Sequence, residues 1–472
     1  MRVSKTRRGQ TPRWRNERRR EDWTRAVIGT TVCCGPEVFS RSSTQSSISL
    51  GTAAYAFWAL NRKEGVMEVV VEIGAGLDVH KKRIVACCLD GRSTPPKRIR
   101  RTFGTFFNQL QSLRDWLVTA GVTDVAMEST GVYWMPVYRV LEGHVRIILG
   151  NARLMANVPG RKTDESDAEW IAVLLRHGLI RPSFVPPKAI RELRQLTRCR
   201  RKLVQMRTTA QLRVDKLLQM ANIKLSSVAS DLFGVSCRKM LRALTDGITD
   251  PVVLSELSYS TLRNKRPQLI QALTGTLSVE DRQLLKIQLD LVDDLKRELG
   301  RVDELIQQKV IPYEAIVQLL DTVPGINRTI AQEILGEIGT DISIWPSQRH
   351  FSAWAGVCPG NRESAGVRRR ARSREGDRYL KSILAQAATS AAHVRGSYCA
   401  ARFRSLKFRL GERRAILALA HELALSIYFI LLRQQPYREP LAADPRLVRD
   451  QRRRSLIKQL QKLGYEVTCS DL

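Results

Sequence analysis

The chain has 472 residues, of which 43% are hydrophobic and 26% charged, so it can bury more than one core and a wholly disordered chain is excluded. Its 78 Lys/Arg against 46 Asp/Glu give a formal net charge of +32. Such a cationic excess indicates a polyanionic partner, with nucleic acid as the first candidate; the alternative is a basic soluble protein without one.

Residues 1–66 differ from the rest of the chain. They hold 13 Lys/Arg against 5 Asp/Glu, lack a regular apolar period and gather Ser and Thr over 42–52. We predict a basic, disordered extension, and Met67, directly before the first strand pattern, is an alternative start of the native protein. The remainder keeps 65 Lys/Arg against 41 Asp/Glu, so the inference of a nucleic-acid partner does not depend on the extension.

Residues 67–182 read as an α/β unit. Apolar runs rich in β-branched residues predict four strands, and helical apolar spacing predicts two helices. The strands are expected in VVVEIGAGLDVH (69–80), RIVACCLDG (83–91), TDVAMES (123–129) and HVRIILG (144–150), and the helices over 106–121 and 164–177, the second with Thr163 as N-cap. Strands that alternate with helices indicate a mixed α/β domain.

Residues 183–312 are predicted to be a helical region with two long helices. Apolar residues at alternating spacings of three and four fit an antiparallel hairpin or a dimerising coiled coil. The seams are Leu193, Leu196, Leu203, Ala210, Val214, Leu217 and Ala221, and then Leu285, Val292, Leu295, Leu299, Val302 and Ile306. Arg200 and Arg207 fall on the first seam, so we expect interruptions there, and shorter helices are expected over 223–279.

Residues 313–433 read as a compact helical segment and 434–472 as a basic tail. The apolar run from Ala415 to Leu432 carries His421 and Glu422, so we predict a buried core helix and no membrane span. The nine cysteines are odd in number and form no Cys-x-x-Cys pair. This argues against a zinc knuckle or a disulfide framework and favours reduced thiols in the cytoplasm.

Four carboxylates stand where strands end and a helix begins. Asp78 and Glu128 end two strand patterns, and Asp164 and Asp167 lie three residues apart on one face of a predicted helix. A carboxylate on a buried strand is costly unless it is paired or metal-bound. Such oxygen donors suit Mg²⁺ or Mn²⁺, and two of these cations about 4 Å apart hold the attacking and leaving oxygens of a phosphodiester.

Simpler roles remain open for these acids. The helix dipole favours acids in a first turn, so Asp164 and Asp167 are explained equally well without a metal. Asp78 could cap a turn, and Glu165 and Glu169 are expected to be solvated.

Cations flank the acids in the sequence. Lys81, Lys82, Arg161 and Lys162 are expected either to contact the scissile strand or to balance the carboxylates. For His80 a structural role is favoured over acid–base chemistry at the metal site.

Two groups of motifs resemble a known family. DVHKK with Asp78, AMESTGVYW with Glu128, and GRKTDESDAEWIA with Asp164 and Asp167 resemble the DEDD transposases of the insertion-sequence one-hundred-ten family. VPGINRTIAQEILGEIG and FSAWAGVCPGNRESAGVRRRARSREGDRYLKSIL resemble that family's C-terminal transposase domain. The motifs run in the same order as in the family, from Met67 to Arg433, and the extension before Met67 has no counterpart.

The resemblance implies a ribonuclease H-like, RuvC-like fold for the α/β unit, followed by the coiled-coil region and an all-α C-terminal transposase domain. The four acids would bind Mg²⁺ or Mn²⁺. The resemblance also implies DNA substrates (element ends and target), a noncoding guide RNA that pairs with both, and a homo-oligomer, dimer or tetramer. Such an enzyme would act in the bacterial cytoplasm, at the nucleoid.

The resemblance further implies a serine nucleophile that forms a covalent link to DNA during strand exchange. The matching position is Ser364 in NRESAG; the family commonly has Ser-Gly, whereas Ala365 intervenes here, so Ser373 is the alternative. Guanidinium groups that suit phosphates surround it in sequence, namely Arg362, Arg368, Arg369, Arg370, Arg372 and Arg374. Without the resemblance, a solvated DNA-binding loop with an ordinary turn serine is the better explanation.

VPGIN at 323–327 resembles the turn of a helix-hairpin-helix, in which backbone N–H groups face a phosphate. Asn327 stands where a second glycine is usual and tolerates a left-handed conformation. The alternative is that Gly325 only ends one helix before the next begins.

The sequence therefore predicts a DNA transposase or recombinase that cuts and rejoins DNA. A RuvC-like junction endonuclease without a covalent intermediate is the first alternative, and a non-catalytic nucleic-acid-binding protein is the second. Covalent protein–DNA adducts distinguish the recombinase from both.

Overall fold

The structure is a computed structural model that describes residues 69–129, 131–151, 167–360, 363–364, 367–368, 373–439 and 457. The expected extension 1–66 lies outside these residues, as do Thr163 and most of the expected basic tail.

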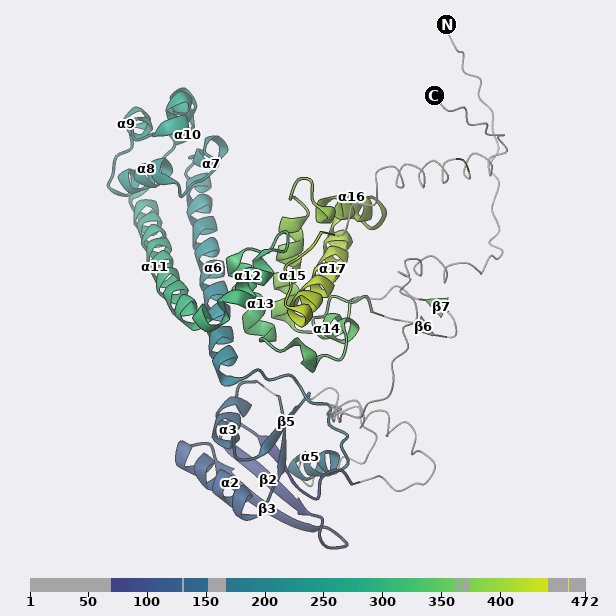
Figure 1. Cartoon of the computed structure of the whole chain (residues 1–472). Helices are drawn as coiled ribbons and strands as arrows, with labels where there is room; N and C mark the ends of the chain where they lie inside the picture. Colours follow the sequence, from purple (N-terminus) through teal and green to yellow (C-terminus); the bar gives the residue numbers. More distant parts are fainter. Residues whose placement is uncertain are drawn as a thin grey trace, which may run out of the picture. The chain divides into compact units, whose positions relative to one another are not determined.

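A five-stranded mixed sheet opens the described chain (Figure 1). Its strand order is β3-β2-β1-β4-β5. β1 pairs antiparallel with β2 and parallel with β4, β2 pairs antiparallel with β3, and β4 pairs parallel with β5. The strands are β1 (Ile73–Val79), β2 (Arg83–Asp90), β3 (Lys97–Gly104), β4 (Asp124–Glu128) and β5 (Arg146–Gly150). The predicted α/β class of this unit is confirmed.

Helices cover both faces of this sheet. On one face α2 (Phe107–Thr119) and α3 (Trp134–Leu141) pack on a core that includes Leu77 and Met127. On the other face α5 (Asp167–Arg176) packs on Ala126 and Cys87. The alternation of buried residues along each strand therefore sorts its side chains between two helical layers.

Two elements of this unit were missing from the sequence prediction. β3 reads KRIRRTFG, and of its residues only Phe103 is buried, because the strand lies at the edge of the sheet. It therefore lacks the apolar pattern by which the other strands were recognised. α3 is short and contains Pro136 in its first turn, where a proline costs no intrahelical hydrogen bond.

Two long helices, α6 (Lys188–Met220) and α11 (Val279–Val310), form an antiparallel hairpin. Their direction follows from two ion pairs, Glu192 with Lys309 and Arg200 with Asp303, in which the residue number rises along one helix and falls along the other. The hairpin alternative of the sequence prediction is thus confirmed. Arg200 interrupts the apolar seam as expected, with its Nε 2.5 Å from the Asp303 carboxylate.

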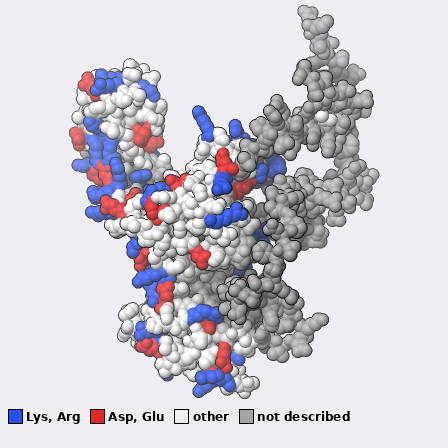
Figure 2. Space-filling model, in the orientation of Figure 1, with Lys and Arg blue, Asp and Glu red and all other residues white. Residues whose placement is uncertain are grey.

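A small helical cluster joins the far ends of α6 and α11. It has its own core around Leu218, Met240 and Leu273. Its elements are α7 (Leu225–Val228), α8 (Val235–Thr245), α9 (Pro251–Glu256), η1 (Ser260–Lys265) and α10 (Arg266–Leu273). The exposed side of the hairpin carries mixed charge, with Lys and Arg interleaved with Asp and Glu (Figure 2), as in the Arg301–Glu298 pair.

The C-terminal part is helical around one apolar core. Its elements are η2 (Ile311–Tyr313), α12 (Glu314–Asp321), α13 (Arg328–Ile338), η3 (Ile342–Ile344), α14 (Gln348–Trp354), the short strands β6 (Glu363–Ser364) and β7 (Val367–Arg368), α15 (Arg378–Ala391), α16 (Tyr398–Leu410) and α17 (Glu412–Arg433). By length and composition α17 is the single helix of the described chain that could cross a membrane. Its residues Leu419, Leu423 and Ile427 are buried in this core, as predicted for a core helix.

Candidate active site

Asp78 and Glu128 leave neighbouring strands at the same end of the sheet. The last pair of the parallel β1–β4 register is Leu77 with Met127, and the two acids directly follow it. Leu77 and Met127 point into the core under α2 and α3. Because side chains alternate along a strand, Asp78 and Glu128 point to the opposite face, the one that α5 covers.

Helix α5 lies directly on strand β1 because β1 has glycines where the two backbones meet. A Cβ on Gly76 would stand 2.1 Å from the carbonyl oxygen of Ala168 and 2.4 Å from the backbone nitrogen of Ala172. Farther back along the strand, a Cβ on Gly74 would stand 3.1 Å from Cδ2 of Leu175. The helix therefore runs with its N-terminus toward the Asp78 end of β1, and Asp167 is its first residue.

The structure thus brings three of the four predicted acids to one end of one face of the sheet. Asp164 lies outside the described residues, as do Arg161 and Lys162. Within the described parts of the chain no group of three or more His, Cys, Asp or Glu side chains is arranged to hold a metal ion. Asp78 and Glu128 nevertheless fit the requirement for hard oxygen donors on adjacent strands, which suits Mg²⁺ or Mn²⁺.

The turn after β1 supplies the polar neighbours of Asp78. His80 Nε2 lies 2.8 Å from Oδ2 of Asp78, so the imidazole orients this carboxylate. Lys81 and Lys82 are exposed in the same turn, and the Lys81 carbonyl accepts a hydrogen bond from Oγ1 of Thr105 at 3.1 Å. The turn is therefore fastened through its backbone, which leaves the two ammonium groups at the surface.

Glu169 corrects the sequence analysis, which expected a solvated side chain. Its carboxylate pairs with Arg98 and Arg100 of the edge strand β3, and only 19% of the side chain is exposed. Residues 98 and 100 share a face of β3, and that face meets α5. The arginines were missed because β3 was missed, although the alternation of basic residues in KRIRR was a usable signal.

The chain around Ser364 is a hairpin. Glu363 pairs with Arg368 and Ser364 with Val367, so the two-residue strands β6 and β7 run antiparallel. The side chains of these four residues lie outside the described part of the structure, as do the residues Arg362, Arg369, Arg370 and Arg372. The structure thus places the backbone of Ser364 in an antiparallel strand pair, and its role as nucleophile stays a prediction.

The base of this hairpin is described in full. Pro359 forms an isolated bridge with Ser373, and the backbone N–H of Arg374 donates to the carbonyl of Cys358 at 3.1 Å. Farther from the tip of the hairpin, a Cβ on Gly376 would stand 2.4 Å from the backbone nitrogen of Gly356. The two strands of the base therefore touch backbone to backbone. These successive contacts hold the hairpin base together where it leaves the helical core.

Ser373, the alternative nucleophile, is engaged in the base. Its Oγ accepts a hydrogen bond at 2.6 Å from Nζ of Lys381, which lies in the first turn of α15. This contact ties the returning strand of the hairpin to the helix that follows it. Arg374 is exposed at the same point.

The VPGIN segment is a tight turn between α12 and α13. The N–H of Ile326 donates to the carbonyl of Val323, and Gly325 has φ +82°, the pattern of a type II turn with Pro324 before the glycine. Asn327 tolerates a left-handed backbone but does not adopt one here, because its φ is −101°. Its side chain caps α13 by accepting a hydrogen bond from the N–H of Ile330. The turn selects asparagine because an extended N-cap needs a side-chain acceptor.

Gly325 also has a packing reason to be glycine. A Cβ there would stand 2.4 Å from both the Ala387 carbonyl oxygen and the Ala391 nitrogen of α15. This side of the turn is occupied by a helix, and phosphate binding by Gly325 and Asn327 stays a prediction.

Two family models match the chain. Residues 75–223 match the DEDD_Tnp_IS110 family, described as a transposase, and residues 317–404 match the family described as Transposase IS116/IS110/IS902. The first match contains all four predicted acids and the second contains both candidate serines. None of the curated proteins compared with the chain matches it.

An α/β unit with acids at one end, followed by a helical transposase segment, defines a DNA-processing enzyme of the transposase class. The chain belongs to the IS110 family of transposases.

Proposed function

We propose that this IS110-family transposase cuts and rejoins DNA with divalent cations held by Asp78, Glu128, Asp164 and Asp167, and with Ser364 as the nucleophile. The observation that supports this most directly is the placement of Asp78 and Glu128. On two adjacent parallel strands, each acid directly follows the last residue that pairs with the other strand. Both acids lie on the face of the sheet that is covered by α5, whose first residue is Asp167. Acids in such an arrangement bring carboxylate oxygens to one end of the sheet, which is the type of donor that a divalent cation needs.

The residues divide the chemistry between them. Asp78, oriented by His80, and Glu128 would hold the cations from the sheet, while Asp164 and Asp167 would hold them from the start of α5. Bound Mg²⁺ or Mn²⁺ would stabilise the charge that develops at the phosphorus and on the leaving oxygen. The Ser364 hydroxyl would form a bond to phosphorus as the bond to the sugar oxygen breaks, and the arginines beside it would hold the phosphate.

The experiment is a strand-exchange reaction with purified protein, Mg²⁺, the element's noncoding RNA and both DNA ends. Wild-type protein should recombine and give covalent protein–DNA adducts. Asp78→Asn and Ser364→Ala should each abolish both, while Ser373→Ala should keep adduct formation. A matched control is Asp90→Asn, because Asp90 ends β2 at the opposite end of the sheet and is paired with Arg92.

Each alternative has its own outcome. Adducts that persist in Ser364→Ala but vanish in Ser373→Ala would transfer the nucleophile to Ser373. Hydrolysis that depends on Asp78 without any adduct would identify a RuvC-like junction endonuclease. Binding of DNA and RNA by wild type without cleavage would identify a non-catalytic nucleic-acid-binding protein.

We further propose that the protein acts as a homo-oligomer, a dimer or tetramer, with the RNA as guide. Apolar side chains on the outer face of α11 support self-association, because Leu284, Ile287 and Leu291 follow helical spacing and are 47%, 58% and 36% exposed. Light scattering of the RNA-bound protein tests this. A monomer at working concentration would contradict it.

A further inference from the structure

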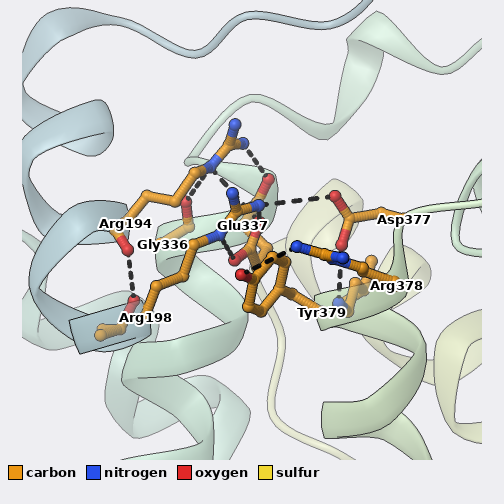
Figure 3. Close-up of polar contacts among 9 residues, drawn as sticks. Arg194, Arg198, Gly336, Glu337, Asp377, Arg378 and Tyr379 are labelled. Atoms are coloured by element: carbon orange, nitrogen blue, oxygen red, sulfur yellow. Dashed lines mark hydrogen bonds and ion pairs between the residues drawn. The ribbon is translucent and has the colours of Figure 1, made fainter. Parts of the chain in front are cut away.

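One face of α6 carries three arginines that are directed at α13 and α15. Arg194, Arg198 and Arg201 follow each other at spacings of four and three, which places them on one side of the helix. They face Glu333 and Glu337 of α13 and the start of α15. Figure 3 shows Arg194 and Arg198 converging on Glu337, with Asp377 and Tyr379 beside them.

The contacts among these residues are close and directed. Nε and Nη2 of Arg198 each donate to the Glu337 carboxylate at 2.7 Å. Arg194 donates from Nε to the Gly336 carbonyl at 3.0 Å and from Nη2 to the Glu337 carbonyl at 2.6 Å. Both arginines thus close on one turn of α13, in the forked geometry that a lysine cannot reproduce.

Arg201 forms a separate contact one turn along α6. Its Nη1 donates to Glu333 at 3.0 Å and its Nη2 to Oγ of Ser382 at 2.7 Å. Arg201 carries the same charge as Arg198 and also contacts α13. The two differ in their carboxylate partners: the guanidinium of Arg198 reaches Asp377, whereas that of Arg201 pairs with Glu333.

The cluster is buried enough to be costly. Only 2% of the Glu337 side chain is exposed, and burial raises the pKa of this carboxyl, an effect that the hydrogen bonds from Arg198 oppose. Replacing a buried ion pair with apolar side chains of similar size is often neutral or stabilising. Stability alone therefore does not explain why three arginines face three acids at this place. A role in fixing the position of α13 and α15 relative to α6 explains the cluster better.

Asp377 connects the cluster to the serine hairpin. Its Oδ2 lies 3.6 Å from Nη2 of Arg198, and its Oδ1 accepts from the N–H of Leu380, which caps α15. The backbone N–H of Asp377 donates to the Trp354 carbonyl at 2.9 Å. Among the contacts of the hairpin base, this one lies farthest from the tip of the hairpin. The guanidinium carbon of Arg198 also lies 3.9 Å from the centre of the Tyr379 ring, two residues farther on.

We propose that Arg198 is a positioning residue for the serine hairpin: acting through Asp377 and Tyr379, it fixes the hairpin base relative to α6. The long helix α6 thereby sets where the nucleophile stands on the bound DNA. This rests on the proposed function, in which a serine of this hairpin attacks phosphorus. A displacement of about 1 Å in a reacting group can cost about 100-fold in rate, so a contact at the base is enough to matter.

The variants that test this are Arg198→Gln, Arg198→Lys and the matched control Arg201→Gln. The glutamine side chain in Arg198→Gln cannot form an ion pair with Asp377 or stack as a cation on Tyr379, whereas Arg201→Gln removes one charge from the same interface without touching the hairpin base. The first readout is the single-turnover rate of adduct formation at saturating DNA and RNA, set beside the Kd for DNA. The second is trypsin cleavage of the native protein within the arginine-rich stretch 368–374, which needs no activity.

Arg198→Gln should slow adduct formation at least about 10-fold more than Arg201→Gln, with the Kd unchanged, because misplacement of a reacting group affects the rate and not the binding. Trypsin should cut 368–374 faster in Arg198→Gln than in Arg201→Gln. Arg198→Lys should recover part of the rate. The double variant Arg198→Gln/Asp377→Asn should be no slower than the slower single variant, because the two residues act in one step.

Equal rates and equal trypsin cleavage in Arg198→Gln and Arg201→Gln would overturn the proposal, as would a loss of Kd that accounts for the whole effect. A failure of the proposed function is seen separately: either wild-type protein gives no adducts, or Ser364→Ala and Ser373→Ala both retain them. The trypsin comparison still reports whether Arg198 holds the hairpin base.

Discussion

The carboxylate end of the sheet and the base of the serine hairpin are held in place by different physical means. At the sheet, backbone meets backbone: Gly76 leaves no room for a Cβ under α5, and strand register sets Asp78 beside Glu128. The strands of the hairpin base also meet backbone to backbone, at Gly356 and Gly376, but side chains of α6 set their position relative to that helix through charge, as in Arg198 with Asp377. The first arrangement is sensitive to volume and the second to charge.

The largest effect is expected from Glu337→Ala. The change leaves Arg194 and Arg198 without their buried partner, and breaking such a pair costs about 3–5 kcal/mol of unfolding free energy. Urea denaturation measures it. The control is Glu298→Ala, which removes an exposed partner of Arg301 and should cost at most about 1 kcal/mol. Equal losses in the two variants would remove the argument that charge holds this part of the molecule.

Gly76→Ala tests the volume side of the comparison. The added methyl group meets the Ala168 carbonyl and must push α5 away, so we expect a loss of about 1–3 kcal/mol, with α5 displaced from Asp78. Because no charge is changed, the loss should be the same at low and high salt. An unchanged denaturation midpoint in Gly76→Ala would show that the close contact is not needed.

Gly300→Ala is the matched control for a glycine without such a contact, and a smaller effect of opposite sign is expected. Gly300 lies inside α11, and a Cβ there has no heavy atom within 4 Å beyond the helix's own backbone in the described part of the chain. Alanine should stabilise the protein by about 0.5–1 kcal/mol, because glycine loses more conformational freedom in a helix. Destabilisation at position 300 would contradict the open surroundings of Gly300 and would mean that another part of the protein covers this side of α11.

The smallest expected effect is the alkylation of Cys87. This thiol lies between β2 and α5, and burial, followed by the nearby Glu169 charge, raises its pKa to about 11. Since the thiolate is the reactive form, iodoacetamide at about pH 8 should modify exposed Cys199 and leave Cys87 unmodified in the native protein. Peptide mass spectrometry reads out both sites. Rapid labelling of Cys87 would show that α5 separates readily from the sheet.

The sequence was sufficient where structure follows from local patterns. β1, β2, β4 and β5 are apolar runs, and Asp78 and Glu128 interrupt such runs, so both the strands and the acids could be recognised. The hairpin of α6 and α11 follows from the spacing of leucines. Each of these depends on residues within one element or its neighbour.

The sequence was insufficient where a partner is distant. The Arg194–Arg198–Arg201 face resembles an ordinary solvated helix surface until Glu337, 139 residues beyond Arg198, is seen beside it. Glu169 was taken as solvated because its partners stand on an unrecognised strand. Asn327 was compared with a glycine that can be left-handed, whereas it is extended and caps the start of α13. The fourth acid and most of the hairpin arginines lie outside the described residues and stay predictions.

The basic composition of β3 has a further consequence. An edge strand offers unpaired N–H and C=O groups to any extended chain, and long apolar edges lead to aggregation. β3 instead displays Lys97, Arg98, Arg100 and Arg101 along that edge. The charges that made this strand hard to recognise in the sequence also make the open edge of the sheet a poor template for a second sheet, and so oppose edge-to-edge aggregation of the protein.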